Sequence, residues 1–153
     1  MAIYFFDTSA LVKRYVNEVG SAWVDGLIDP AAGHSARVAS ITGVEVVSAI
    51  ARRERRGSIS PTDAATVRAD FRYDFANLYQ VTVITPAIVT RAMTLAELHA
   101  IRGFDAVQLA VALEVAAECL ALGLALTLVS ADAELNAAAR AEGLAVEDPN
   151  AHP

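Results

Sequence analysis

Apolar residues along the chain gather in short runs that alternate with longer stretches of helical periodicity. The short runs are rich in β-branched and aromatic residues and predict strands at 3–6, 34–39, 79–84, 125–129 and 144–147. Between them, apolar spacing and capping residues predict helices at 10–16, 18–29, 40–56, 61–77, 86–100, 105–122 and 132–141. Strands that alternate with helices favour an α/β fold, in which helices cover both faces of a parallel sheet.

The chain length favours one domain, because 153 residues can build one hydrophobic core without disulfides. We expect a single domain at 1–148 and a loose C-terminal tail at 149–153. The single cysteine, Cys119, excludes an intrachain disulfide and a cysteine zinc cluster. The first residues lack the basic region of a signal peptide, and charged residues interrupt the longest apolar stretch, at 106–129. We therefore expect a cytoplasmic protein with no membrane segment.

The charge of the chain is distributed unevenly. The chain carries 12 Lys and Arg residues against 18 Asp and Glu residues, for a net charge of −6. Residues 1–76 hold nine of each sign, whereas residues 77–153 hold three basic and nine acidic residues. A generic nucleic-acid binder is basic, because phosphate contacts supply most of its affinity. Any function on nucleic acid must therefore explain the acids.

Two aspartates follow predicted strands. Asp7 comes directly after the strand at 3–6, and Asp132 follows the strand at 125–129 through two small residues. Ligands of open α/β sheets bind outside the carboxyl ends of the strands, so both positions favour a functional site. Capping of the next helix is the alternative role for each aspartate.

Two further acids lie in apolar helices. Glu45 has no basic neighbour at the helical spacings of three and four, where the residues are Ile41, Thr42, Ser48 and Ala49. Burying an unpaired carboxylate is costly, so Glu45 is unlike an ordinary core position. Asp105 is the first residue of the apolar helix predicted at 105–122. Its alternative to a role in a functional site is a favourable interaction with the helix dipole.

Together these acids predict a carboxylate cluster, whose members are Asp7, Glu45, Asp105 and Asp132. Mutual repulsion opposes such a cluster, and a bound cation relieves it. Mg²⁺ or Mn²⁺ prefers oxygen ligands and needs few histidines or cysteines. The hydroxyls of Thr8, Ser9 and Ser130 would then hold waters or phosphate oxygens nearby.

The acids occur in four blocks, at 6–15, 40–46, 105–110 and 129–135. With these blocks in this order, the chain resembles the PIN-domain nucleases over about residues 2–148, and among them the VapC toxins of toxin–antitoxin modules. The resemblance implies a three-layer α/β/α sandwich with a central parallel sheet. It also implies a Mg²⁺- or Mn²⁺-dependent endoribonuclease, a homodimer and a cognate antitoxin protein.

The resemblance also implies roles for individual residues. The catalytic and metal-binding residues would be Asp7, Glu45, Asp105 and Asp132, with Ser9 and Ser130 as supporting hydroxyls. A water activated by the metal would attack the phosphodiester phosphorus, and the ions would neutralise the charge that develops. The acids then serve catalysis, and the negative net charge no longer conflicts with an RNA substrate.

Basic residues of the first half are the candidates for RNA contacts. Lys13 and Arg14 closely follow the first block, and Arg52 and Arg53 begin an arginine run at the end of the helix at 40–56. We predict that these four contact the RNA backbone. For the arginine run, compensation of the helix dipole on a solvated face is the alternative.

Three other functions stay open. A phosphatase of the haloacid-dehalogenase type usually has a second aspartate two positions after its nucleophile, where this chain has Ser9. A receiver-like signalling domain has paired acids at the end of its first strand, where Phe6 precedes Asp7. A degenerate PIN domain that only binds protein would not need the full set of acids.

Overall fold

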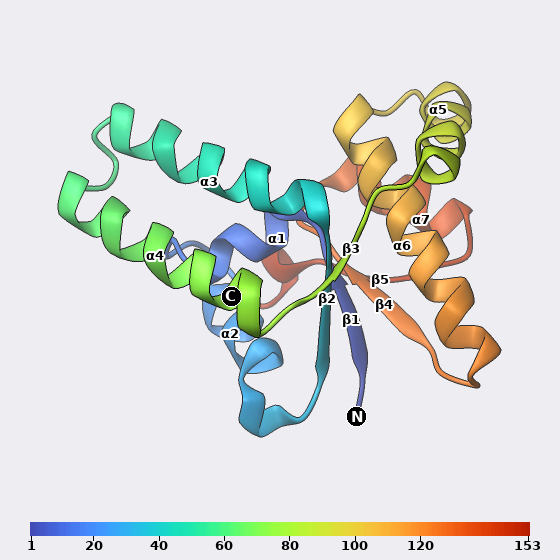
Figure 1. The fold of residues 1–153 in the computed structure, drawn as a ribbon, viewed down its shortest axis with the longest axis horizontal. Coiled ribbons are helices and arrows are strands. Elements are labelled where there is room, and N and C mark those ends of the chain that lie inside the picture. The colour runs from blue at the N-terminus through green and yellow to red at the C-terminus, as the bar shows by residue number, and fades with distance from the viewer.

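The computed structural model describes residues 1–153 as a five-stranded sheet between two layers of helices (Figure 1). The strands are β1 (Ile3–Phe6), β2 (Ser35–Ala39), β3 (Gln80–Thr82), β4 (Leu126–Val129) and β5 (Ala145–Glu147). All neighbouring strands pair in parallel, in the order β3-β2-β1-β4-β5. Every strand predicted from the sequence is present, which confirms the α/β fold with a central parallel sheet.

Seven α-helices form the outer layers. One face of the sheet packs against α1 (Thr8–Leu11), α2 (Ser21–Ile28), α3 (Ser40–Arg55) and α4 (Pro61–Asn77). The other face packs against α5 (Pro86–His99), α6 (Gly103–Ala121) and α7 (Ala133–Ala141). None of these helices combines the length and the apolar character needed to cross a membrane.

Alternating side chains of the central strand serve two separate cores. Ile3 and Phe5 of β1 join the core under α5, α6 and α7, whereas Phe6 joins the core under α1 to α4. Phe5 and Phe6 are fully buried. Because successive strand residues point to opposite faces, a strand covered on both sides reads as a continuous apolar run. The run Ile3–Phe6 has this pattern.

The order in which the chain adds strands to the sheet reverses between β1 and β4. It moves outward from β1 to β2 and β3, then crosses back to β4 on the other side of β1 and ends at β5. The carboxyl ends of β1 and β4 therefore lie side by side, and the amide of Asp7 donates to the carbonyl of Val129 at 3.1 Å. Such a reversal leaves a crevice in which α/β proteins bind ligands.

Some predicted boundaries differ from the structure. The predicted helix at 10–16 is α1 followed by a 3₁₀ turn at Val12–Arg14, and it begins earlier because the Asp7 carboxylate caps it. The predicted helix at 18–29 begins only at Ser21, after Gly20 adopts a left-handed conformation with φ of 84°. The strand predicted at 79–84 is shorter, at Gln80–Thr82.

The prediction of a loose tail at 149–153 is wrong. Pro149–Ala151 forms a 3₁₀ turn, and Pro149 is buried. The His152 ring stacks on Trp23 of α2, with ring centroids 4.1 Å apart. Asn150 accepts a hydrogen bond from the Lys13 ammonium at 3.1 Å. Aromatic stacking and this partly buried polar contact hold the segment against α2.

Candidate active site

Four acids from distant parts of the sequence line one cavity of about 260 Å³, which we call the acidic cavity. Asp7 follows β1, Glu45 lies in α3, Asp105 in the first turn of α6, and Asp132 at the start of α7. The cavity opens at the carboxyl ends of β1 and β4, the two parallel strands between which the strand order reverses. The structure thus brings together the carboxylates that the sequence singles out.

Asp7 is the most buried of these acids, with 3% of its surface exposed. Its Oδ1 accepts hydrogen bonds from the Ser9 hydroxyl at 2.7 Å and from the Ala10 amide at 3.2 Å. Burial raises the pKa of Asp7 to about 7, although the bonds from Ser9 and Ala10 lower it, and the charge of Asp105 raises it further. Asp7 is therefore both the cap of α1 and a carboxylate that is costly to ionise without a cation.

Glu45 is held by two side chains on neighbouring elements. Its Oε1 accepts from the Thr8 hydroxyl and from the Gln108 amide, both at 2.9 Å. The same Gln108 amide lies 2.9 Å from the buried Thr42 hydroxyl. Gln108 is 1% exposed, and its own carbonyl oxygen has no partner. The bonds from Thr8 and Gln108 fix the carboxylate of Glu45 toward the cavity.

Arg102 spans the other two acids at the mouth of the cavity. Its Nε donates to Asp105 at 3.0 Å and its Nη2 to Asp132 at 2.7 Å. Burial raises the pKa of Asp105; the hydrogen bond from Arg102 opposes this rise, and the charges of Asp132 and Glu45 add to it. The guanidinium is thus a positive group that offsets the repulsion between two carboxylates.

The predicted supporting hydroxyls contact the acids or the nearby backbone. Ser9 bonds Asp7 and also accepts from the Ala131 amide at 2.9 Å, which ties the end of β1 to the segment after β4. The buried Ser130 hydroxyl accepts from the Asp132 amide at 3.1 Å. Thr8 donates to Glu45. Each hydroxyl therefore helps to orient an acid.

The residues present fit a divalent cation in chemistry, although no three acidic or histidine side chains already converge on one point. All the donors are carboxylate and hydroxyl oxygens, the ligands that Mg²⁺ and Mn²⁺ prefer. Asp105 and Asp132 both pair with Arg102, so the guanidinium supplies a positive charge between these two carboxylates. Asp7 is buried beside them with its second oxygen free of hydrogen bonds. A cation would complete the charge balance of this donor set.

Of the predicted RNA contacts, the structure brings two to the acids and places two elsewhere. Arg52 and Arg53 line the acidic cavity. Lys13 is buried, and its ammonium donates to the Val19 carbonyl at 2.9 Å as well as to Asn150, so its prediction as a phosphate contact is wrong. Burial beneath the C-terminal segment was not visible in the sequence.

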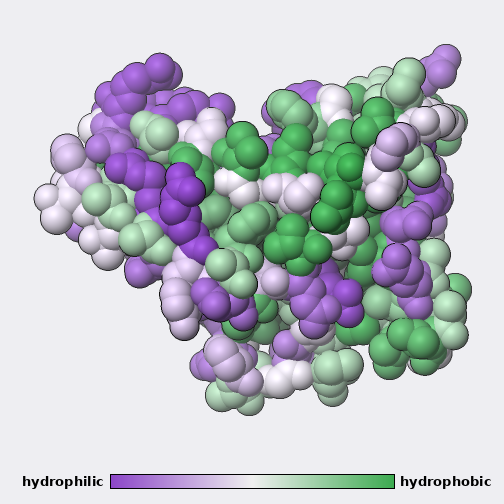
Figure 2. Space-filling model, in the orientation of Figure 1, coloured by the Kyte–Doolittle hydropathy of each residue, from purple (hydrophilic) through white to green (hydrophobic).

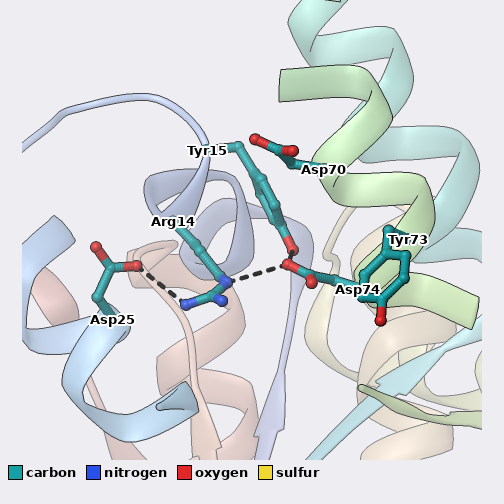
Figure 3. Close-up of a pocket in the computed structure, with 6 residues that line it drawn as sticks. All are labelled: Arg14, Tyr15, Asp25, Asp70, Tyr73 and Asp74. Carbon is teal, nitrogen blue, oxygen red and sulfur yellow. Dashed lines mark hydrogen bonds and ion pairs between the residues drawn. The ribbon is translucent and has the colours of Figure 1, made fainter. Parts of the chain in front are cut away.

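Arg14 lies in a separate cavity of about 340 Å³ between α2 and α4, apart from the acids, and its contact with RNA stays a prediction (Figure 3). Its guanidinium pairs with Asp74 at 3.3 Å and Asp25 at 3.4 Å. Tyr15 donates to the same Asp74 carboxylate at 2.7 Å, and burial raises its pKa. These contacts link α2 to α4, and none of the residues belongs to the acidic cavity.

Three polar residues of the site were not predicted from the sequence, namely Gln108, Thr42 and Arg102. Gln108 stands one helical turn after Asp105 and interrupts an otherwise apolar stretch, and Arg102 stands one turn before Asp105. A polar residue on the same helical face as a candidate ligand is the signal that would have found both. Thr42 stands one turn before Glu45, again on its face.

Comparison with known proteins assigns the chain to a family. A model of the PIN domain matches residues 4–141. The chain belongs to the PIN-domain family. Over 116 residues this PIN domain is 34% identical to the ribonuclease VapC45 of Mycobacterium tuberculosis. The aligned region covers 75% of this chain and 78% of that relative. It is therefore a VapC-type PIN domain, and the phosphatase and receiver alternatives do not apply.

Solved structures share the fold of this PIN domain. FitAcB from Neisseria gonorrhoeae superposes with a TM-score of 0.65 at 18% identity, covering 95% of this chain and 97% of that one. VapBC2 from Rickettsia felis, solved bound to a DNA fragment from its promoter, gives a TM-score of 0.56 at 15% identity over 95% and 98% of the two chains. These likenesses confirm the three-layer sandwich.

Proposed function

We propose that this PIN domain is an endoribonuclease and the toxin of a toxin–antitoxin pair. The observation that carries the proposal is the convergence of Asp7, Glu45, Asp105 and Asp132 on one cavity at the carboxyl edge of the sheet. The relative VapC45 bears the name of a ribonuclease, and the four acids of this chain are present and gathered. A degenerate PIN domain would have no need of this arrangement.

We propose that the four carboxylates hold Mg²⁺ or Mn²⁺. When bound, such an ion activates a water molecule for attack on phosphorus and neutralises charge on the phosphoryl and leaving oxygens. The residues of the chain orient the site. Thr8 and Gln108 fix Glu45, Ser9 fixes Asp7, and Ser130 positions the backbone of Asp132.

The local charge of the molecule supports an RNA substrate despite the net charge of −6. Four acids form the acidic cavity, and Arg52 and Arg53 line the same cavity. A phosphodiester would therefore meet cationic side chains beside the acidic cavity. We propose that these two arginines contact the RNA backbone near the cleaved bond.

We also propose a cognate antitoxin and a homodimer in the cytoplasm. The acidic cavity would accept an arginine of the antitoxin, because a guanidinium pairs with carboxylates through several N–H groups, as Arg102 does here by bridging Asp105 and Asp132. For the homodimer, Figure 2 shows apolar groups gathered on the face between α3 and α5. Exposed apolar residues on the elements there are Val44, Val83, Val89 and Met93. An apolar surface of this kind favours association with another protein surface.

Cleavage of single-stranded RNA oligonucleotides with and without Mn²⁺ tests the proposal. We expect cleavage only with the metal, and a loss of orders of magnitude in Glu45→Gln and Asp105→Asn with the fold retained. Asp63→Asn, an exposed acid in the first turn of α4, is the matched control and should cut normally. Products should carry 5′-phosphate and 3′-hydroxyl ends, and 2′,3′-cyclic phosphate ends would exclude the mechanism. Normal cleavage by Glu45→Gln would remove the acids from catalysis.

A further inference from the structure

A second cavity, lined by basic side chains, adjoins the acidic cavity. It has a volume of about 520 Å³ and includes Arg52, Arg53 and Arg56, and we call it the basic groove. Ala49, Arg52 and Arg53 line both cavities. The two cavities therefore share this wall and lie next to each other.

The shared wall is one face of helix α3. Glu45, Ala49, Arg52, Arg53 and Arg56 are spaced by 4, 3, 1 and 3 residues, which places them on one side of a helix. At 1.5 Å per residue, the path from Glu45 to Arg56 is about 16 Å long. One helical face thus runs from a candidate catalytic acid to a cluster of arginines.

Two of the arginines in the groove have free guanidinium groups. Arg52 and Arg56 are exposed, and their side chains make no ion pair or hydrogen bond in the structure. Arg53 is different, since it pairs with Glu18 on the opposite wall and donates to the Ala49 carbonyl at 3.3 Å. The groove therefore offers two unpaired positive charges on a wall that Arg53 and Glu18 hold in place.

The composition of the groove favours a phosphate-bearing strand over a peptide. A helical peptide needs an apolar groove, but most residues that line this one are polar or charged. An acidic peptide that continued past the arginines would place carboxylates against Asp7 and Glu45 without a cation between them. Arginine forks match phosphate oxygens, and a phosphodiester strand can be held by arginines at one point and by cations at the next.

We propose that the basic groove binds the RNA phosphates on one side of the cleaved bond, so that the strand follows the α3 face from Glu45 toward Arg56. The inference rests on the proposed ribonuclease function and adds to it the path of the substrate. Arg52 and Arg56 contact phosphates along the groove, and Arg53, which pairs with Glu18, adds a contact where the groove meets the acidic cavity. The contacts are to the backbone, so they act on RNA of any sequence.

Binding of a fluorescently labelled, mixed-sequence single-stranded RNA to the full chain tests the path. The measurement is made by anisotropy over a series of salt concentrations, in the presence of a metal chelator. We expect the double variant Arg52→Gln/Arg56→Gln to bind roughly tenfold or more weakly than the unmodified protein. The plot of log affinity against log salt should become shallower by about 0.7 for each arginine removed.

A matched double variant, Arg55→Gln/Arg91→Gln, removes the same charge from the rest of the surface. Both residues are exposed, make no ion pair and line neither cavity, so RNA affinity should stay close to that of the unmodified protein. If both double variants lost RNA affinity equally, the overall charge of the protein would explain the loss, and the groove would not be the path of the RNA.

The outcomes separate this inference from the function it rests on. If the Arg52/Arg56 variant binds and cuts RNA normally while Asp105→Asn abolishes cutting, the groove proposal fails and the ribonuclease proposal stands. If the unmodified protein neither binds nor cuts RNA, the proposed function itself fails. If the variant loses only its complex with a protein partner, the groove is a protein-docking site and the RNA path is wrong.

Discussion

Arg102 and Asp132 lie 30 residues apart in sequence, yet the Arg102 Nη2 atom is 2.7 Å from the Asp132 Oδ2 atom. The same guanidinium donates to Asp105 through Nε, so one exposed arginine neutralises two of the four acids in the acidic cavity. A cation that binds these carboxylates must compete with Arg102, because both need the same oxygens. Arg102 is thus an internal counter-ion of the site.

The competition predicts the behaviour of Arg102→Gln. We expect this variant to bind Mn²⁺ several-fold more tightly than the unmodified protein in titration calorimetry, since the competing positive charge is gone. Arg91→Gln, which removes an exposed and unpaired arginine from α5, should leave the Mn²⁺ affinity unchanged. Weaker Mn²⁺ binding by Arg102→Gln would mean that the arginine assembles the metal site instead of competing for it.

The buried carboxylate of Asp7 predicts a pH-dependent stability. Burial raises the pKa of Asp7 from 3.8 to about 7, so the folded state holds this proton more tightly than the unfolded state. The free energy of unfolding therefore falls as the pH rises from about 4 to about 7. A pKa change of this size corresponds to an effect on the order of 4 kcal/mol.

Asp7→Asn keeps the shape and removes the titration. In metal-free buffer we expect the variant to match the unmodified protein near pH 4 and to be more stable above pH 7, by up to a few kcal/mol in urea unfolding. Added Mn²⁺ should stabilise the unmodified protein and have little effect on Asp7→Asn. A constant stability difference at all pH values would show that ionisation of Asp7 costs nothing.

The buried amide of Gln108 predicts a role in positioning Glu45. Gln108→Met has a similar size. It removes the amide that bonds Glu45, Thr42 and Thr8, together with a carbonyl oxygen that has no partner. We expect the free energy of unfolding to fall by about 1–3 kcal/mol, because the buried Thr42 hydroxyl loses its partner and the removal of the unsatisfied oxygen offsets only part of that loss. Cleavage should fall at least roughly tenfold, since a small misplacement of a catalytic group is costly.

The control for Gln108 is Gln80→Met in β3, where the glutamine is exposed and far along the sheet from the acids. It should leave cleavage unchanged. If Gln108→Met cuts RNA at the normal rate, the hydrogen bond from Thr8 alone is enough to orient Glu45. The Gln108 amide would then have no role in catalysis.

The elements of this fold and the acids of its site could be predicted from sequence because their signals are local. Apolar periodicity identifies each strand and helix, and a strand-end aspartate such as Asp7 is visible next to its strand. The reach of Arg102 to Asp132 depends on how α6 packs beside α7, which no local pattern encodes. For the same reason no local pattern shows that Lys13 is buried and bonded to Asn150 of the C-terminal segment.

The contact between Gly20 and Pro149 gives a test of that C-terminal segment. Gly20 has φ of 84°, and a Cβ atom there would lie 2.2 Å from the Pro149 carbonyl oxygen. Gly33 has φ of 70° with no atom within 4 Å of its Cβ position, so it serves as the control for backbone strain alone. We expect Gly33→Ala to cost roughly 1–2 kcal/mol of stability from the left-handed conformation. Gly20→Ala should cost about 1–3 kcal/mol more, because the clash is with backbone that cannot rotate away.

Removal of residues 149–153 should abolish this extra cost. In the shortened chain the Pro149 carbonyl is gone, so Gly20→Ala and Gly33→Ala should destabilise the protein equally in urea unfolding. The two substitutions and the truncation form a cycle that isolates the contact between the α2 N-terminus and the segment after β5. If Gly20→Ala stays the more costly substitution without residues 149–153, the strain at Gly20 arises within the turn before α2. The Pro149 carbonyl would then contribute nothing to that strain.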